Sequence, residues 1–355
     1  MYPWIVITGG IFAFIAAMGI GANDVANAYA TSIGSKSLTV RQAVILASIF
    51  EAGGAILMGS HVTKTIRKGI ADYQCFEDDP GSLMYGSMWV CFSVGMWLFI
   101  ASKYEMPVST THSCVGGMIG MTLALKGPKC VIWYAEKDTF PYIGGVGGIV
   151  ASWIVSPVFS AILSSSLFGF LRCSFLRSEN SFSISKIAFP LLVGTTITLN
   201  TFYIVYKGAK GLGLDDTPLD VACAWAFGLG GVSAVGIYPV TSYIQNRIEE
   251  KFNTSQTSDE QNSRRGISSK KHPTEDLSKK CNFNSDCLEQ KDCTGIVKHI
   301  NKSLKIDLDE VIAGDENVLA IHDSAEKFEP KTEELFKSLQ VFTAICDSFS
   351  HGAND

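Results

Sequence analysis

The chain has 355 residues with a formal net charge of −5, and 47% of its residues are hydrophobic against 18% charged. A chain of this length could form two or three soluble domains. Long apolar runs fill most of residues 4–246 and exclude that arrangement, because so many apolar segments in succession cannot be buried in a water-soluble core. The composition therefore predicts a protein of the lipid bilayer, and no nucleic-acid partner is expected.

Seven apolar runs precede the charged second part of the chain. Several of them approach or exceed the ~18–20 residues that cross a bilayer as a helix, and few charges interrupt them. Glycine is plentiful, as it is where membrane helices pack closely. The runs are Trp4–Ile20, Ala43–Met58, Met84–Ala101, Val115–Leu125, Ile143–Leu171, Ile187–Tyr206 and Val221–Ile244. The sequence predicts an all-α integral membrane protein with about seven spans in this part.

The first apolar run leads into a polar segment, Gly19–Gly34, which we expect to be a broken helix. Asn23 and Asn27 are four residues apart and share a face wherever this segment is helical. The carboxylate of Asp24 is costly inside a membrane unless it is paired or binds a cation, and the motif contains no Lys or Arg. Amide and carboxylate oxygens suit a small hard cation. We therefore predict that Asn23, Asp24 and Asn27 bind Na⁺, with a proton or helix capping as alternatives.

The second run carries a carboxylate, Glu51, in its middle. A carboxylate inside the membrane is expected to be functional. Glu51 could complete the cation site, be protonated during turnover, or form a hydrogen bond to a neighbouring helix. The sequence leaves these three roles open.

A second broken segment is expected at Pro107–Gly117. Pro107 disfavours helix in the residue before it and suits a helix start, where N–H groups carry partial positive charge. Irregular polar backbone persists in a bilayer only where protein or a water-filled cavity covers it. This segment therefore predicts an anion site, with ordinary N-capping as the alternative. The predicted ligands are Ser109, Thr110 and Thr111. His112 is interpreted as a structural hydrogen-bonding residue or else as a proton carrier.

The ten cysteines are scattered along the chain, and no CxxC pair occurs. Cys281, Cys287 and Cys293 are spaced by six residues, which matches no standard zinc pattern. The cysteines are therefore interpreted as buried structural thiols. No cofactor is expected apart from the predicted Na⁺ ion.

Residues 247–337 are strongly charged and differ from the rest of the chain. The stretch 256–272 is rich in Ser, Lys and Arg and cannot bury enough apolar surface to fold alone. We expect a soluble, largely disordered loop, and its basic residues favour a cytoplasmic position. Seven crossings before it would then place the N-terminus outside. The predicted organisation is a first membrane repeat over residues 1–246, this loop, and the start of a second repeat over residues 338–355.

The chain ends by repeating one of its own motifs. Gly21-Ala22-Asn23-Asp24 follows the first apolar run, and the same four residues return as Gly352-Ala353-Asn354-Asp355 after another apolar stretch. A polar motif duplicated at the edges of distant apolar segments is typical of transporters built from inverted repeats. We therefore expect that the chain is truncated at the start of a second repeat, and that Asn354 and Asp355 belong to the cation site.

Four blocks of the sequence resemble the inorganic phosphate transporter family. They are GANDVANAYATSIGSKSLTVRQA (21–43), FEAGGAILMGSHVTKTIRKGI (50–70), MPVSTTHSCVGGMIG (106–120) and SHGAND (350–355). The resemblance implies a helical transporter of two inverted repeats that binds phosphate and sodium between its halves. It implies a sodium–phosphate symporter of the plasma membrane rather than an enzyme, and it allows a homodimer.

The family's motifs fall on the residues already selected. The resemblance implies phosphate ligands at Ser109, Thr110 and Thr111, cation ligands at Asn23, Asp24, Asn27, Asn354 and Asp355, and a functional glutamate at Glu51. The central loop is not covered by the resemblance.

Three other functions stay open. A related transporter would be proton-driven, with Glu51 or His112 carrying the proton. A phosphate sensor could use the same pocket without net uptake. An intramembrane hydrolase could pair Ser109 with His112 or Asp24, because residues three apart share a helix face, but no GxSxG motif supports it.

Overall fold

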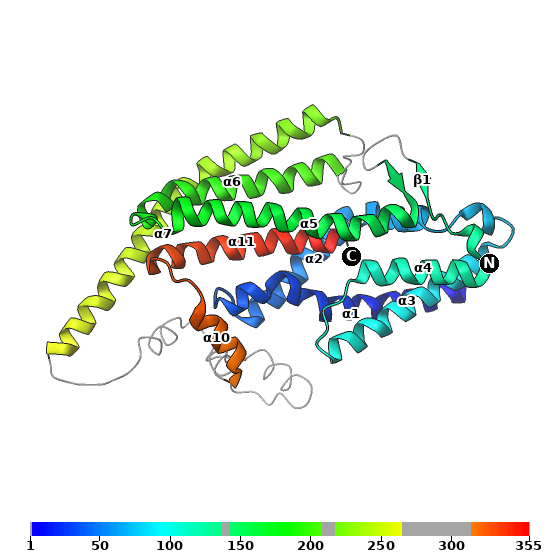
Figure 1. Cartoon of the computed structure of the whole chain (residues 1–355), viewed down its shortest axis with the longest axis horizontal. Coiled ribbons are helices and arrows are strands. Elements are labelled where there is room, and N and C mark those ends of the chain that lie inside the picture. Colours follow the sequence, from blue (N-terminus) through cyan, green and yellow to red (C-terminus); the bar gives the residue numbers. More distant parts are fainter. Residues whose placement is uncertain (1, 137–141, 208–216, 265–313, 355) are drawn as a thin grey trace.

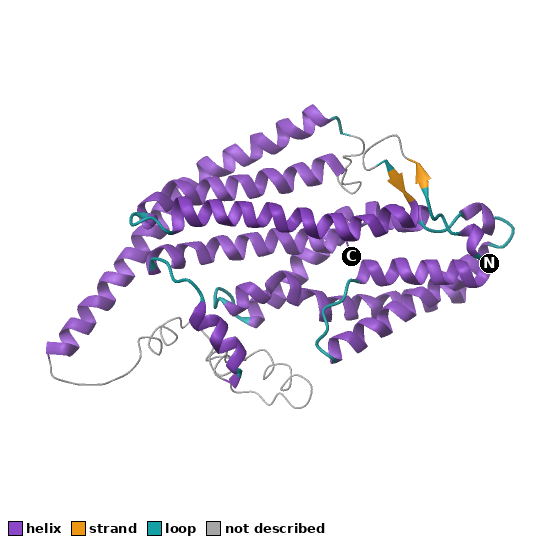
Figure 2. Cartoon of the chain, in the orientation of Figure 1, coloured by secondary structure: helices purple, strands orange, loops and turns teal. Residues whose placement is uncertain are grey.

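The computed structural model describes residues 2–136, 142–207, 217–264 and 314–354, with backbone alone at 60–68 and 255–264. Most of these residues are helical, and the long helices lie side by side in one elongated bundle (Figure 1). Figure 2 shows one short strand hairpin, at the end of the bundle where the N-terminus lies.

The helices are α1 (Pro3–Gly34), α2 (Val40–Gly69), α3 (Pro80–Lys103), α4 (Thr110–Lys126), α5 (Gly145–Leu171), α6 (Ser181–Lys207), α7 (Leu219–Arg264), α10 (Glu316–Ser324) and α11 (Pro330–Asn354). Two 3₁₀ turns, η1 (Tyr73–Phe76) and η2 (Pro128–Cys130), and a π-helical turn, η3 (Arg172–Leu176), complete the helical structure that is described. Strands β1 (Ala135–Glu136) and β2 (Ile143–Gly144) pair antiparallel.

Six of the described helical segments are long and apolar enough to cross a bilayer, and they lie in α1, α2, α3, α5, α6 and α7. The chain is therefore a multi-pass integral membrane protein with an all-α fold. The run Val115–Leu125, expected to be a seventh span, lies in α4. That helix has 17 residues, and at about 1.5 Å per residue it is shorter than a hydrocarbon core of ~30 Å.

Helix α1 runs without interruption through Gly34, so the prediction of a broken helix at Gly19–Gly34 is wrong. The first glycine of this segment, Gly19, packs against α3 instead. A Cβ atom at Gly19 would lie 2.9 Å from Leu98 Cβ, and one at Gly95 would lie 3.1 Å from Ala16 Cα. The absent side chains let the backbones of α1 and α3 approach closely, as small residues do between membrane helices.

Helices α3 and α4 form a hairpin whose two outer ends meet. A disulfide joins Cys75, before α3, to Cys130, after α4. The backbone N–H of Asp72 also donates to the carbonyl of Cys130 (2.9 Å). Helix α4 therefore returns to the end of the bundle from which α3 starts, and residues 104–109 form the inner tip of the hairpin. The second predicted break, Pro107–Gly117, is confirmed at its start, since residues 107–109 lie between two helices, but it is wrong for residues 110–117, which belong to the continuous helix α4.

The interpretation of the cysteines as thiols is wrong for Cys75 and Cys130. These residues are 55 positions apart in the sequence, and only the hairpin brings them to bonding distance. The described free cysteines are Cys91, Cys114, Cys223 and Cys346, which are partly buried, and Cys173. Cys173 is exposed, so its interpretation as a buried thiol is also wrong. Cys281, Cys287 and Cys293 lie outside the described residues.

The described parts of the charged region 247–337 are largely helical. Helix α7 continues through Arg264, past the boundary predicted at residue 246, and α11 begins at Pro330. The first part of the stretch 256–272, predicted to be disordered, therefore belongs to a helix. The remainder of that stretch lies outside the described residues.

Two carboxylates in the segment between α10 and α11 form hydrogen bonds to residues that follow α5 and to the start of α6. Glu326 accepts hydrogen bonds from Nε of Arg172 (2.6 Å) and Nε of Arg177 (2.8 Å), and the bond from Arg177 is the largest cause of a lowered pKa at Glu326. Glu329 accepts from the hydroxyl of Ser181 (2.7 Å) and from a backbone N–H in the first turn of α6 (3.1 Å). The start of a helix favours such a negative charge.

Helix α11 packs against α2 through two glycines. A Cβ atom at Gly54 would overlap the carbonyl oxygen of Phe349, and a Cβ atom at Gly352 would overlap the carbonyl oxygen of Glu51. Neither position accepts a side chain unless a helix moves, so these contacts fix the distance between α2 and α11.

We predict that Gly54→Ala destabilises the protein by ~1–3 kcal/mol, the usual cost of overpacking a close contact. Gly59→Ala in the same helix is the control, because a Cβ atom there meets nothing within 4 Å. Thermal unfolding of the two purified variants in detergent measures the difference. Equal unfolding temperatures would mean that glycine contacts do not set the distance between α2 and α11.

Candidate functional site

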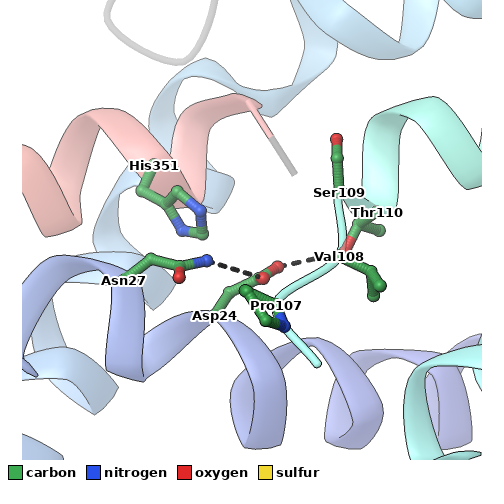
Figure 3. A pocket seen from close by; sticks show the side chains of 7 residues that line it. All are labelled: Asp24, Asn27, Pro107, Val108, Ser109, Thr110 and His351. Carbon is green, nitrogen blue, oxygen red and sulfur yellow. Dashed lines mark hydrogen bonds between the residues drawn. The ribbon is translucent and has the colours of Figure 1, made fainter. Parts of the chain in front are cut away.

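The candidate site is centred on Asp24 of α1, whose residue is only 2% exposed. Its Oδ2 accepts a 3.0 Å hydrogen bond from the hydroxyl of Thr110, and its Oδ1 accepts a 3.3 Å bond from Nδ2 of Asn27 (Figure 3). Both carboxylate oxygens have a donor, as a buried charge requires. The structure thus joins the Asn/Asp motif and the Ser/Thr motif at one point.

Asn23 contacts the hairpin tip. Its Nδ2 donates to the carbonyl of Met106 (3.0 Å) and to the hydroxyl of Ser102 (3.3 Å), and its Oδ1 accepts from the backbone N–H of Val108 (3.1 Å). The other two predicted Na⁺ ligands of α1 line the pocket at the site, whereas Asn23 is not among the described residues that line it.

The tip of the hairpin leads into the N-terminus of α4. Ser109 is the N-cap, and its Oγ accepts from the backbone N–H of His112 (3.3 Å). The hydroxyl keeps its own hydrogen as a donor, so capping and anion binding are compatible. The imidazole of His112 packs against Trp153 of α5, with 4.2 Å between the ring centroids. Ser109 and His112 thus meet through the backbone, which does not activate a serine as a nucleophile.

A pocket of about 270 Å³ lies between α1, the hairpin tip and α11 (Figure 3). Its lining residues are Asp24, Asn27, Pro107, Val108, Ser109, Thr110 and His351. The start of α4 supplies partial positive charge, and Asp24 supplies a carboxylate. A pocket with charges of both signs can hold an anion and a cation next to each other. Thr111 and His112 are not among the described residues that line it.

His351 connects the pocket to Glu51. Its Nδ1 lies 3.9 Å from Oε1 of Glu51, and the two side chains are 24% and 16% exposed. Glu51 belongs to α2 and is absent from the described lining of the pocket. Glu51 is therefore linked to the pocket through His351 of α11, which contacts Glu51 and lines the pocket.

The second copy of the repeated motif meets α6. Oδ1 of Asn354 accepts from the hydroxyl of Tyr203 in α6 (3.3 Å), and its Nδ2 donates to the carbonyl of Ser350 (3.0 Å). Asp355 lies outside the described residues. Cation binding by Asn354 and Asp355 stays a prediction.

Sequence reasoning missed His351. The residue stands directly before the second copy of the motif, where the first copy has Ile20. A titratable side chain in place of an apolar one, at the edge of a duplicated motif, is the signal that could have found it. Val108 also lines the pocket. Its apolar side chain gives no sign of this in the sequence.

Comparison with known protein families decides the family of the chain. Residues 20–355 match the phosphate transporter family. The chain belongs to this family. The sodium-dependent phosphate transporter 1 of Mus musculus is 35% identical over 301 residues, which are 84% of this chain and 40% of the mouse protein. The sodium-dependent phosphate transporter of Plasmodium falciparum is 39% identical over 205 residues, which are 58% of this chain and 29% of that protein.

A solved structure of a sodium-dependent phosphate transporter has the same fold. It matches with a TM-score of 0.66 and 29% sequence identity, over 99% of this chain and 64% of that chain. This phosphate transporter family member therefore has the helical fold of a transporter. The chain spans less than half the length of the mouse and Plasmodium relatives.

We predict that Thr110→Val lowers thermal stability more than Thr122→Val. Both threonines are buried in α4. The hydroxyl of Thr110 donates to Asp24, whereas that of Thr122 donates to the carbonyl of Met118 in its own helix. Valine at position 110 takes a donor from a buried carboxylate, which costs ~1–3 kcal/mol. Unfolding temperatures of the two variants compare these costs. The reverse order would mean that Thr110 is not an important donor to Asp24.

Proposed function

We propose that the complete protein is a secondary active transporter that imports inorganic phosphate together with Na⁺ by alternating access. The observation that carries the proposal is the pocket in which a buried carboxylate, Asp24, lies beside the N-terminus of α4. The names of the two relatives, both sodium-dependent phosphate transporters, support the choice of substrate and ion.

The first turn of α4 is the proposed anion half of the site. N–H groups at a helix start have no partner within the helix and bind phosphate oxygens well. Ser109 and Thr110 line the pocket beside this helix start. The one hydroxyl hydrogen of Thr110 goes to Asp24, so Thr110 donates to phosphate only when Na⁺ takes its place at that carboxylate. Thr111, the third predicted ligand, follows in the same turn. Each hydroxyl that donates to a phosphate oxygen contributes a charge-assisted hydrogen bond of ~1.5–3 kcal/mol.

Asp24 makes phosphate binding depend on a cation. A phosphate anion and a carboxylate repel each other when both lie in one pocket shielded from water. A Na⁺ ion held by Asp24 and the amide oxygen of Asn27 replaces this repulsion with attraction. The ion and phosphate then increase each other's affinity by the same factor, which is the basis of cotransport.

The membrane potential also requires a co-transported cation. Moving an anion into a cell with a negative interior costs about 2.3 kcal/mol per charge per 100 mV. Sodium ions that move with phosphate offset this cost and add the energy of their own gradient. The plasma membrane is the proposed location because it carries such a gradient. A homodimer stays a prediction.

Proton coupling is a second candidate, favoured by one contact. Glu51 and His351 lie 3.9 Å apart, and His351 lines the pocket. An imidazole and a carboxylate can each accept and release a proton, so this pair could move a proton between the pocket and α2.

Uptake of radiolabelled phosphate by cells that express the full-length protein tests the proposal. We predict that replacing external Na⁺ with choline at fixed pH stops uptake.

We also predict that Asp24→Asn has no uptake in Na⁺, because an amide keeps the shape of the side chain and loses its charge. Asp220→Asn is the control, since Asp220 is exposed at the start of α7.

Two results would contradict this proposal. Uptake that persists in choline and rises as the external pH falls would identify H⁺ as the coupling ion. Sodium-dependent uptake by Asp24→Asn at the wild-type rate would remove Asp24 from the cation site.

We predict that Glu51→Gln reduces net uptake while surface expression persists, because glutamine preserves the packing against α11 and removes the charge that faces His351. Glu77→Gln is the matched control, since Glu77 is exposed in the segment before α3. Uptake is measured between pH 6 and 8 with surface biotinylation alongside. Wild-type uptake by Glu51→Gln at every pH would make Glu51 a structural residue.

A further inference from the structure

The carboxamide of Asn23 bonds to the hairpin tip and to the last turn of α3. An asparagine side chain has two N–H donors and one carbonyl oxygen with two lone pairs. Both donors are used, toward the carbonyl of Met106 (3.0 Å) and the hydroxyl of Ser102 (3.3 Å), and the oxygen accepts from the N–H of Val108 (3.1 Å). The residue is only 7% exposed. One side chain of α1 thus holds three points within seven residues of the hairpin.

Backbone hydrogen bonds hold the first half of the tip to the end of α3, because the N–H groups of Tyr104, Glu105 and Met106 donate to carbonyls of that helix. The second half has no such bonds among those described. Pro107 has no backbone N–H, and Glu105 adopts a left-handed backbone conformation (φ 57°) that is uncommon outside glycine. Val108, on the C-terminal side of the proline, gives its N–H to Asn23. Asn23 is therefore hydrogen-bonded to the residues on both sides of the proline, Met106 and Val108. We call these two hydrogen bonds the Asn23 bracket.

The outer end of the hairpin is fixed independently. The Cys75–Cys130 disulfide joins the segments that flank α3 and α4. Close packing between Gly95 and Ala16 holds α3 against α1. With the hairpin held in this way, the bonds of Asn23 set the local path of residues 106–108, which lead into α4. That path determines whether the start of α4 faces Asp24.

Asn23 and Asp24 are consecutive residues with different surroundings. Asp24 lines the pocket and accepts from Thr110, which begins α4. Consecutive helical residues point about 100° apart, so one turn of α1 directs one side chain to the hairpin tip and the next to the pocket.

We propose that Asn23 is a positioning residue for the anion half of the site, and not a cation ligand. Its carboxamide holds the hairpin tip so that the N-terminus of α4 and the hydroxyls of Ser109 and Thr110 converge on the pocket beside Asp24. The affinity for phosphate depends on this bracket, whereas Na⁺ binds at Asp24 and Asn27. This inference rests on the proposed function for its link to phosphate, but the bracket itself does not.

The variant Asn23→Asp separates a positioning role from a ligand role. Aspartate keeps an oxygen for Na⁺ and for the N–H of Val108, and it loses the amide donors to Met106 and Ser102. A cation ligand would bind Na⁺ equally or more tightly after this change. A positioning residue would lose phosphate affinity and leave the sodium dependence unchanged.

Phosphate uptake is measured across a concentration series, and sodium dependence at saturating phosphate. We predict that Asn23→Asp raises the half-saturating phosphate concentration about tenfold, the equivalent of ~1.4 kcal/mol. Ser102→Ala, which removes one partner of Asn23 outside the pocket, raises it about threefold. Ser93→Ala is the control, because Ser93 is an exposed serine of the same helix. The half-saturating sodium concentration stays within twofold in all three variants.

Hydrogen exchange of the purified protein supplies a readout that does not need transport. Peptides covering residues 104–110 are expected to exchange faster in Asn23→Asp and Ser102→Ala than in wild type and Ser93→Ala, because local opening governs exchange. Faster exchange in a protein that takes up no phosphate would support the bracket and contradict only the proposed function. Unchanged exchange in both variants, or a shift in sodium dependence without one in phosphate dependence, would overturn the inference.

Discussion

A carboxylate buried among apolar helices is the constraint on which the rest of this structure depends. Asp24 cannot lie in such surroundings without donors or a cation. Two of its donors are Asn27, on the same helix, and Thr110, at the start of α4. The hairpin of α3 and α4 places that helix start beside Asp24.

The pocket lies where two tightly packed helix pairs border each other. Helix α1 is held close to α3 by Gly19 and Gly95, and α2 is held close to α11 by Gly54 and Gly352. Asp24 and the hairpin tip belong to the first pair, and His351 belongs to the second. Because close-packed glycine contacts resist sliding, a change of pocket shape is easiest by movement between the pairs. The walls of the site are therefore rigid bodies, and its volume depends on how they are placed.

Much of the site could be predicted because its chemistry is unusual for a membrane. An Asp inside an apolar stretch and a Pro-Val-Ser-Thr-Thr run can both be recognised from the sequence. The structure places Asp24 of the first beside Thr110 of the second. The sequence predicts a broken helix at Gly19–Gly34 because glycines and polar residues stand there at membrane depth. In the structure α1 is continuous, and Gly19 packs against α3. The disulfide and the contact of Glu51 with His351 depend on the three-dimensional path of the chain. No local pattern encodes such distant pairs.

Helix α4 returns to the side of the membrane from which α3 starts. This return decides how many crossings are counted in the topology of the chain. A hairpin that enters and leaves by one face adds no net crossing, so the passages that count are α1, α2, α5, α6 and α7. Five and seven are both odd, and either number puts the N-terminus and the charged region after α7 on opposite faces. The start of α3 lies beside the N-terminus, since the rings of Trp4 and Tyr85 are 6.2 Å apart. If the charged region is cytoplasmic, the Cys75–Cys130 bond faces the exterior, the oxidising compartment in which disulfides persist.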